Sequence, residues 1–287
     1  MTSTIEQQPT SPQKFERFHT HIEPSKNWLS IQIKELWMYR ELLFFLAWRD
    51  IKIRYQQTVL GFSWALLQPF MTMVVFSLFF GRLGKIPSEG LPYPIFNYTA
   101  LLPWTFFEQA ISVSTNSLVA NSNMVTKVYF PRLFVPISSV ISGLVDFAIA
   151  FIVLIGMMLF YKITPTVNVA LLPLFMLLAF VTAMGVSLWM SALNVKYRDV
   201  RFIVPFLSRF WFFATPIAYP SNLLSEPWRT LYGLNPMVGV VEGFRWALLG
   251  TDPPQTMIFI SVIVAVVLFF SGLLYFNRTE KTFADVI

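Results

Sequence analysis

Three cations lie close together shortly before the first long apolar segment of the chain: Arg49, Lys52 and Arg54. Arginine can hold a phosphate through two parallel hydrogen bonds, whereas lysine supplies a compact point charge. The group therefore predicts a binding site for an anionic, phosphate-bearing ligand. The same cations would follow from the rule that Lys and Arg gather on the cytoplasmic side of membrane proteins. The sequence leaves both interpretations open.

Other residues that support catalysis are scarce. The chain has no cysteine, and its two histidines, His19 and His21, lie in a polar leader, so we expect no metal site. The Gly84–Lys85 pair lacks the preceding glycine of a phosphate-binding loop, because Phe79 stands at that position. An enzyme acting on polyprenyl phosphates would need acidic metal ligands or a cluster of basic catalytic residues, and neither occurs. Uphill transport would therefore draw its energy from an ion gradient or from a separate ATPase.

Aromatic residues make up 17% of the chain, and we expect most of them to face lipid or the membrane surface. Four lie together in a comparatively polar segment: Tyr98, Trp104, Phe106 and Phe107. Aromatic rings offer apolar faces and polar edges that suit sugars. We therefore expect these four side chains to line a channel and to make weak, repeated contacts there.

Two acidic residues, Glu108 and Asp146, lie inside apolar segments. A charged side chain at the bilayer centre costs about 2.5–3.5 kcal/mol on insertion scales, so each must face protein or water. Arg209 is the intramembrane cation that could pair with either of them. We expect structural or channel-lining roles rather than a proton relay, because no intramembrane lysine or histidine accompanies them.

Composition identifies the medium around these residues. Only 13% of the 287 residues are charged and the mean hydropathy is +0.60, whereas soluble domains carry about 25% charged residues. A helix needs about 20 apolar residues to cross a hydrocarbon layer of about 30 Å, and backbone groups in lipid must be paired within the helix. We therefore predict an all-α integral membrane protein with six transmembrane helices. The predicted spans are 59–80, 94–119, 133–161, 167–195, 202–219 and 257–276.

The distribution of Lys and Arg predicts how these spans are oriented. With a cytoplasmic N-terminus, fifteen Lys and Arg residues fall on the cytoplasmic side and five on the other. Both termini are therefore expected in the cytoplasm, with a flexible N-terminal tail over 1–27 and a C-terminal tail over 277–287. The leader has no apolar core and is not expected to be a signal peptide. The net charge of +6 follows this topology rather than one dense patch, so no nucleic acid partner is expected.

The segment 28–58 has the periodicity of a helix followed by a turn. Its apolar stripe consists of Ile33, Trp37, Phe44, Trp48 and Ile51. Tryptophan on the apolar side predicts an amphipathic helix at the membrane interface. A soluble-type helix packed on a partner is the alternative.

Two connecting segments also carry structure of their own. Proline and glycine interrupt residues 220–254, which predicts two external re-entrant half-helices rather than a further span. Residues 121–132 hold an apolar cluster that we expect to be exposed. The cluster predicts a short helix inserted into a partner's groove, with anchoring at the membrane interface as the alternative.

Six motifs occur in the order typical of ABC-2-type polysaccharide exporter permeases. They are RYQQTVLGFSWALLQP (54–69), PYPIFNYTALLPWTFF (92–107), KVYFPRLFVP (127–136), NVKYRD (194–199), TPIAYP (215–220) and LNPMVGVVEGFRWALLG (234–250). The chain thus resembles subunits that export O-antigen, capsule or teichoic acid, from about residue 42 to residue 276. An ABC-2 exporter of drugs or small lipids is the alternative, against which the first motif and the aromatic second span argue.

The resemblance implies the remaining assignments. The chain would be a non-catalytic permease of the bacterial cytoplasmic (inner) membrane, a homodimer that moves a polysaccharide linked to a polyprenyl pyrophosphate lipid. No cofactor is expected in this chain, because two copies of a separate cytoplasmic ABC ATPase would bind ATP and Mg. The external half-helices would form a gate. The implied coupling residues are Val125, Lys127, Val128, Tyr129, Phe130, Pro131 and Arg132. The implied lipid gate comprises Arg49, Lys52, Arg54, Tyr55, Thr58 and Gly61.

Overall fold

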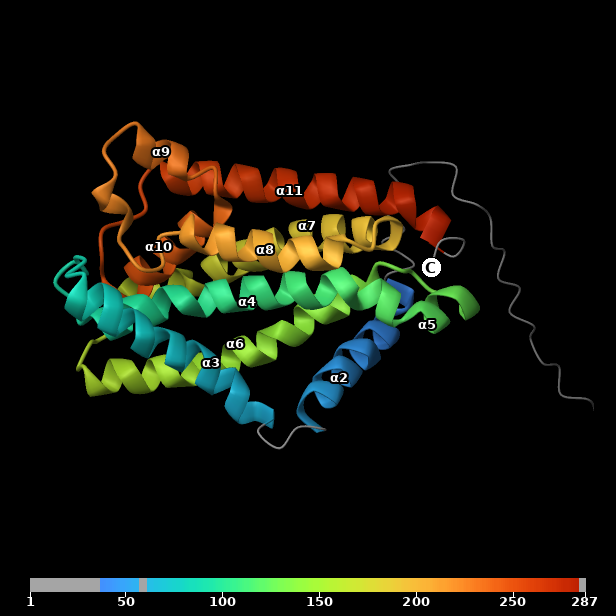
Figure 1. Ribbon diagram of the computed structural model, residues 1–287, viewed down its shortest axis with the longest axis horizontal. Helices are drawn as coiled ribbons and strands as arrows, with labels where there is room; N and C mark the ends of the chain where they lie inside the picture. The colour runs from blue at the N-terminus through green and yellow to red at the C-terminus, as the bar shows by residue number, and fades with distance from the viewer. Residues whose placement is uncertain (1–36, 57–60, 284–287) are drawn as a thin grey trace, which may run out of the picture. The chain divides into compact units, whose positions relative to one another are not determined.

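The computed structural model describes residues 37–56 and 61–283 of the chain. Every regular element in these two ranges is helical (Figure 1), as the sequence predicts. The polar leader, the beginning of the predicted surface helix (28–36), Thr58 and residues 284–287 lie outside the described residues.

Four of the described helical segments are long and apolar enough to cross a membrane, and they confirm four of the six predicted spans. The first, Ser63–Leu83, joins α3 (Gly61–Phe76) to the π-helical η1 (Ser77–Leu83). The second is α6 (Phe134–Phe160), and the third, Val167–Lys196, joins the short η2 (Val167–Leu171) to α7 (Leu172–Lys196). The fourth, Met257–Thr282, joins α11 (Met257–Thr279) to η4 (Glu280–Thr282).

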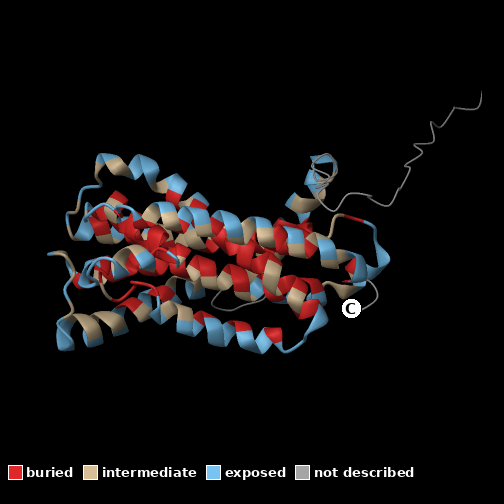
Figure 2. Ribbon diagram, turned by 90° about the horizontal axis from the view of Figure 1, so that it is seen from above, coloured by how far each residue is buried: buried red, intermediate tan, exposed pale blue. Residues whose placement is uncertain are grey.

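The segment predicted as the second span forms the central helix of the bundle. This helix, α4 (Tyr93–Ala120), lies between α6 and α7 (Figure 1). It is about 42 Å long at 1.5 Å per residue, but it is too polar to qualify as a span by hydropathy. Neighbouring helices surround it and bury polar residues such as Asn97, Thr99 and Thr115. Figure 2 shows the buried residues concentrated along the middle of the bundle.

The segment predicted as the fifth span, 202–219, is a shorter helix followed by a turn. Helix α8 (Val200–Phe213) has 14 residues and is therefore about 21 Å long, less than the hydrocarbon thickness of about 30 Å. The chain leaves the helix before Pro216, and side chains of the bundle bind the carbonyl groups that follow. Tyr93 donates to the Ala218 carbonyl at 2.6 Å and Asn97 to the Ile217 carbonyl at 3.1 Å.

Glycine allows α7 and α11 to pack at close range. A Cβ atom added at Gly185 would lie 2.7 Å from the backbone nitrogen of Phe269, and one added at Gly272 would lie 2.5 Å from the Gly185 carbonyl oxygen. Small residues let membrane helices approach in this way. Beside the contact Trp189 stacks on Tyr275, with ring centroids 4.3 Å apart.

Helix α2 (Arg40–Gln56) packs against α6 (Figure 1), and its expected place at the membrane interface stays a prediction. Its aromatic residues Phe44 and Trp48 are exposed, whereas polar residues near its C-terminal end face α6. Arg54 reaches Asp146, the thirteenth of the 27 residues of α6. The Arg54 side chain thus meets α6 at the middle of that helix.

The other predicted segments contain short helices. Residues 220–254 form η3 (Ser221–Leu223), α9 (Trp228–Tyr232) and α10 (Pro236–Leu249), so two α-helices are present as expected, and their re-entrant position stays a prediction. Residues 121–132 contain α5 (Ser122–Lys127). The predicted C-terminal tail is partly structured, because Phe283 is buried against Phe276 with ring centroids 5.3 Å apart.

Candidate functional site

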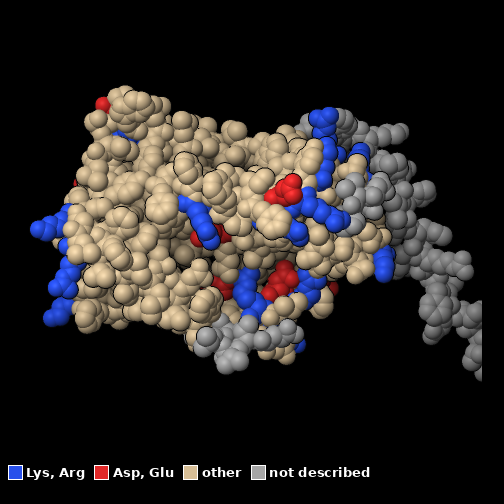
Figure 3. Space-filling model, in the orientation of Figure 1, with Lys and Arg blue, Asp and Glu red and all other residues tan. Residues whose placement is uncertain are grey.

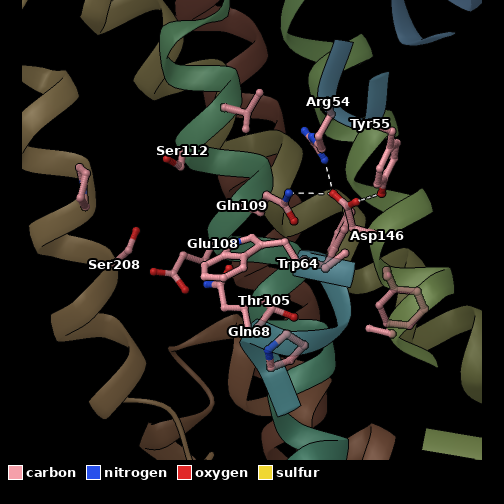
Figure 4. Close-up of a pocket in the computed structure, with 17 residues that line it drawn as sticks. Arg54, Tyr55, Trp64, Gln68, Thr105, Glu108, Gln109, Ser112, Asp146 and Ser208 are labelled. Atoms are coloured by element: carbon pink, nitrogen blue, oxygen red, sulfur yellow. Dashed lines mark hydrogen bonds and ion pairs between the residues drawn. The ribbon is translucent and has the colours of Figure 1, made fainter. Parts of the chain in front are cut away.

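Asp146 accepts hydrogen bonds from two other helices. Arg54 Nη1 and Tyr55 Oη of α2 donate to its two carboxylate oxygens, and Gln109 Nε2 of α4 donates to Oδ2 at 2.7 Å. Figure 4 shows the three side chains converging on the carboxylate. A carboxylate in the middle of an apolar helix is costly unless it is paired and hydrogen-bonded. The donors explain why α6 tolerates this charge.

Helical spacing brings α2 and α6 together along a polar seam. Residues four apart lie on one face of a helix. On α2 this spacing places Asp50 and Arg54 on the same face. On α6 it places Ser138, Ser142 and Asp146 on the same face. Ser138 donates to Asp50 Oδ2 at 3.1 Å, and Arg54 Nη2 donates to Ser142 Oγ at 3.4 Å. The α2–α6 contact therefore relies on polar groups at each of these positions. The matching spacing is the sequence signal that could have identified Asp146 as the partner of Arg54.

A cavity of about 740 Å³ opens beside this cluster, between α2, α3, α4, α6 and α8. Its polar lining includes Arg54, Asp146, Gln109 and Ser112. Its apolar lining comprises Trp64, Ala65, Pro69, Phe106, Val113, Phe147, Ala150 and Pro205. Figure 3 shows acidic and basic side chains together in a hollow on an otherwise largely uncharged face. Pockets that bind small molecules typically have volumes of about 300–1,000 Å³, an apolar lining and a few polar groups. This cavity has all three features.

The other intramembrane acid, Glu108, lines the same cavity but faces away from Asp146. Figure 4 shows its carboxylate directed towards Ser208 of α8. Arg209 is exposed and forms no salt bridge with the residues that the structure describes. The sequence left open whether Arg209 pairs with Glu108 or with Asp146. In the structure Asp146 is paired with Arg54.

The three cations expected at the lipid gate do not converge on one point. Arg49 is paired with the neighbouring Asp50, through nitrogen–oxygen distances of 2.8 and 3.1 Å. Arg54 is paired with Asp146, while Lys52 is exposed. Among the other gate residues Tyr55 joins the Asp146 cluster and Gly61 begins α3. Carboxylates thus neutralise both arginines in this structure.

The four aromatic residues expected to line a channel are buried in the bundle. Tyr98 donates to the Ala150 carbonyl at 3.1 Å, and Trp104 and Phe107 pack against each other with centroids 5.4 Å apart. Only Phe106 among the four borders the cavity. Neighbouring helices cover the other three, so their position in this structure does not support the prediction that they line a channel.

The expected coupling segment is only partly exposed. Val128 and Tyr129 are exposed, at 57% and 62%, whereas Val125 and Phe130 are buried at 2% and 6%. The two buried residues pack into the main core, which corrects the expectation that the whole apolar cluster is exposed. In the rest of the segment Lys127 is exposed, Pro131 and Arg132 are partly buried, and Arg132 donates to the carbonyl of Glu280.

A third ion pair, which was not predicted from the sequence, lies in α10. Arg245 donates to Glu242 Oε1 at 3.2 Å, and the two side chains are 1% and 4% exposed. Arg245 also donates to the carbonyls of Phe96, Ile217 and Tyr219 at 3.3, 2.8 and 3.4 Å. Its guanidinium lies 3.6 Å from the centroid of the Phe96 ring. The pair therefore anchors α10 to α4 and to the turn after α8.

Comparison with known proteins covers nearly the whole chain. Residues 41–249 match the family model described as ABC-2 type transporter. The chain is 31% identical over 259 residues to the O-antigen export system permease protein RfbA of Myxococcus xanthus, covering 89% of this chain and 98% of that protein. It is 26% identical to the protein of the same name from Klebsiella pneumoniae, covering 90% of this chain and all of that protein. It is 24% identical to the polysialic acid transport protein KpsM of Escherichia coli, covering 81% and 91%. The chain belongs to the ABC-2 type transporter family of multi-pass membrane proteins.

Proposed function

We propose that this chain is the permease subunit of an exporter that moves a lipid-linked polysaccharide, of the O-antigen or capsule kind, across the bacterial cytoplasmic (inner) membrane. The observation that carries the proposal is the similarity across 98% of an O-antigen export permease. The wider similarity to a polysialic acid transport protein supports a polysaccharide as the substrate class. The polyprenyl pyrophosphate carrier is the lipid that this proposal assigns to the polymer.

The export proposal is tested by depleting the chain in its own host. Surface polymer is expected to disappear while lipid-linked polymer accumulates inside the cell, and a plasmid-borne copy restores the surface polymer. Polymer that still reaches the surface in the depleted strain would overturn the proposal. Loss of polymer both inside and outside would instead indicate a role in synthesis.

The proposed exporter draws its energy from a separate ATPase. Two permease copies and two ATPase copies form the complex, and the ATPase binds ATP and Mg. Both termini of the permease lie in the cytoplasm, on the side of the ATPase. Val128 and Tyr129 are the side chains we assign to this contact, because they follow α5 and remain exposed in the folded chain.

The ATPase contact is tested by changing Val128 and Tyr129 together to alanine. Exposed apolar and aromatic anchors contribute most of the energy of many interfaces, and losing one costs about 2 kcal/mol or more. We expect a permease of normal abundance that retains at least tenfold less ATPase on affinity purification. Phe130→Ala is the matched control, because this buried residue should reduce the amount of folded permease instead. Normal ATPase retention in the double variant would place the contact elsewhere.

A further inference from the structure

We propose that Arg54, Tyr55 and Gln109 form a binding site for a lipid-borne phosphate group, and that the Asp146 carboxylate occupies this site until the ligand displaces it. The inference rests on the proposed function and deepens it. It adds Gln109 to the residues that bind the ligand. It also makes the Asp146 carboxylate a competitor of the ligand phosphate for the same hydrogen-bond donors.

The donors are arranged around a single oxyanion. A guanidinium and a phenol from α2 and an amide from α4 converge on the two oxygens of Asp146. Carboxylate and phosphate are both acceptors with several lone pairs, and arginine binds either through the same planar donor geometry. The donor set could therefore hold a phosphate where the carboxylate now lies.

The charges around the cavity show why the carboxylate must leave first. Arg54 contributes one positive charge, whereas Asp146 and Glu108 contribute two acidic groups. A phosphate entering this arrangement would meet an arginine that is already paired and a second acid across the cavity. The site becomes attractive to an anion only when Arg54 separates from Asp146.

The seam between α2 and α6 permits that separation. Its hydrogen bonds join Asp50 to Ser138 and Arg54 to Ser142 and Asp146. Water or a phosphate can replace such polar contacts, because the exchange conserves hydrogen bonds. Arg54 is 23% exposed, so it is accessible from the cavity side.

The rest of the cavity favours an amphiphile over a free anion. Trp64, Phe106 and Phe147 line it together with the charged groups. A ligand that fills both parts needs a phosphate and an apolar surface, such as the prenyl chain of a lipid or the face of a sugar. The phosphate of a lipid-linked sugar meets both requirements.

The test measures ligand binding by the purified permease–ATPase complex in lipid nanodiscs. The probe is undecaprenyl diphosphate, with inorganic pyrophosphate as a second arm, and the variant is Asp146→Asn. Asparagine keeps the shape of the side chain and removes the competing charge. We expect the apparent affinity for the lipid to rise about tenfold, because a ligand binds more tightly when its binding-competent state is more populated. Arg54→Ala in the same background should abolish the gain.

Ser138→Ala serves as the matched control. It removes a hydrogen bond from the same seam without touching the Asp146 cluster, so it reports any effect of loosening α2 in general. An Asp146→Asn complex that is folded and binds the lipid no more tightly than the parent would overturn the proposal. An equal gain in lipid affinity for Ser138→Ala would overturn it too. Such a gain would mean that loosening the α2–α6 contact, rather than removing the Asp146 charge, raises the affinity.

The second arm identifies the source of the phosphate. Binding of undecaprenyl diphosphate but not of pyrophosphate at equal concentration assigns the site to a lipid, whereas equal binding of both would overturn the lipid assignment. If Asp146→Asn does not fold, Gln109→Glu replaces it. That variant exchanges a donor for a second carboxylate and should lower lipid affinity at least tenfold, and unchanged affinity would refute the site. This experiment measures binding and not transport. A negative result would therefore refute the phosphate site without bearing on the export function, which the depletion experiment tests separately.

Discussion

Two ion pairs in this protein use the same chemistry in different surroundings. In the α10 pair, Arg245 and Glu242 are almost completely buried, and Arg245 also binds three backbone carbonyls. In the α2–α6 pair, Arg54 and Asp146 are 23% and 9% exposed, and they border a cavity. The first pair joins segments of the bundle core, whereas the second joins a peripheral helix to the bundle. A fully enclosed pair must stay intact, but a pair beside a cavity can exchange partners.

Burial decides the energetic consequence of breaking each pair. Removing one member of a buried pair leaves an uncompensated charge and costs about 3–5 kcal/mol. The α2–α6 pair is less enclosed, because Arg54 is 23% exposed and both residues border the cavity, so breaking this pair should cost less. We therefore expect variants of the α10 pair to affect folding, and variants of the α2–α6 pair to affect export by a folded protein.

The largest effect is expected from Arg245→Ala. The change leaves Glu242 buried without its cation and removes one hydrogen-bond donor from each of three carbonyls, so little folded permease should remain. The measurement is the yield of monodisperse protein in mild detergent, with Arg82→Ala as control because Arg82 is an exposed arginine at the end of η1. A normal yield of Arg245→Ala would mean that the two pairs do not differ as their burial implies.

The next largest effect is expected from fixing α2 to α6. The chain contains no cysteine, so Asp50→Cys with Ser138→Cys introduces a single pair at positions whose side chains are hydrogen-bonded. Crosslinking with a short bifunctional thiol reagent should abolish export, and a reducible reagent should allow recovery on reduction. Each single cysteine variant, treated identically, is the control. Full export by the crosslinked protein would show that α2 need not separate from α6.

A smaller effect is expected from Arg54→Lys. Lysine keeps the charge but has no planar donor pair, so we expect a marked reduction of surface polymer at matched membrane levels. Arg54→Ala should reduce it further, and Lys52→Ala less. Export by Arg54→Lys at the parental level would indicate that charge alone suffices at this position.

The sequence predicted the helical architecture and four spans because long apolar runs have few alternatives in lipid. It did not predict the shortness of α8, which depends on carbonyl groups captured by Tyr93, Asn97 and Arg245 from distant parts of the chain. Such contacts leave no local pattern. Composition alone could not distinguish α8 from a longer apolar span.

The candidate site was predicted in part. Arg54 was identified from its position, but its partner Asp146 lies 92 residues away, and the pairing depends on how α2 packs. The aromatic residues of α4 illustrate the same limit. Trp104 and Phe107 are equally aromatic on a channel wall or in a core, and only the packing of neighbouring helices shows that they are buried.

The smallest effect is expected near the α10 pair, from Glu89→Gln. Glu89 lies in the loop between η1 and α4 and accepts a hydrogen bond from Asn222 at 2.9 Å. Burial raises the pKa of the Glu89 carboxyl above its ordinary value, and the negative charge of Glu242 raises it further, against the opposing effect of Arg245. The folded protein therefore binds this proton more readily than the unfolded chain does.

The direction of the pH dependence follows from that raised pKa. The Glu89 contribution to stability is largest below the ordinary carboxyl pKa, and it is lost as the pH rises through the raised pKa of the folded state. Glutamine cannot ionise, so Glu89→Gln should be slightly more stable than the parent at neutral pH, with no gain at pH 4. Thermal unfolding of both proteins in detergent between pH 4 and 8 measures this difference, and Asp199→Asn, at an exposed acid that is not among the groups acting on Glu89, is the control. A neutral-pH melting temperature equal to or below that of the parent would show that burial and the neighbouring charges do not raise the pKa of Glu89 in the folded protein.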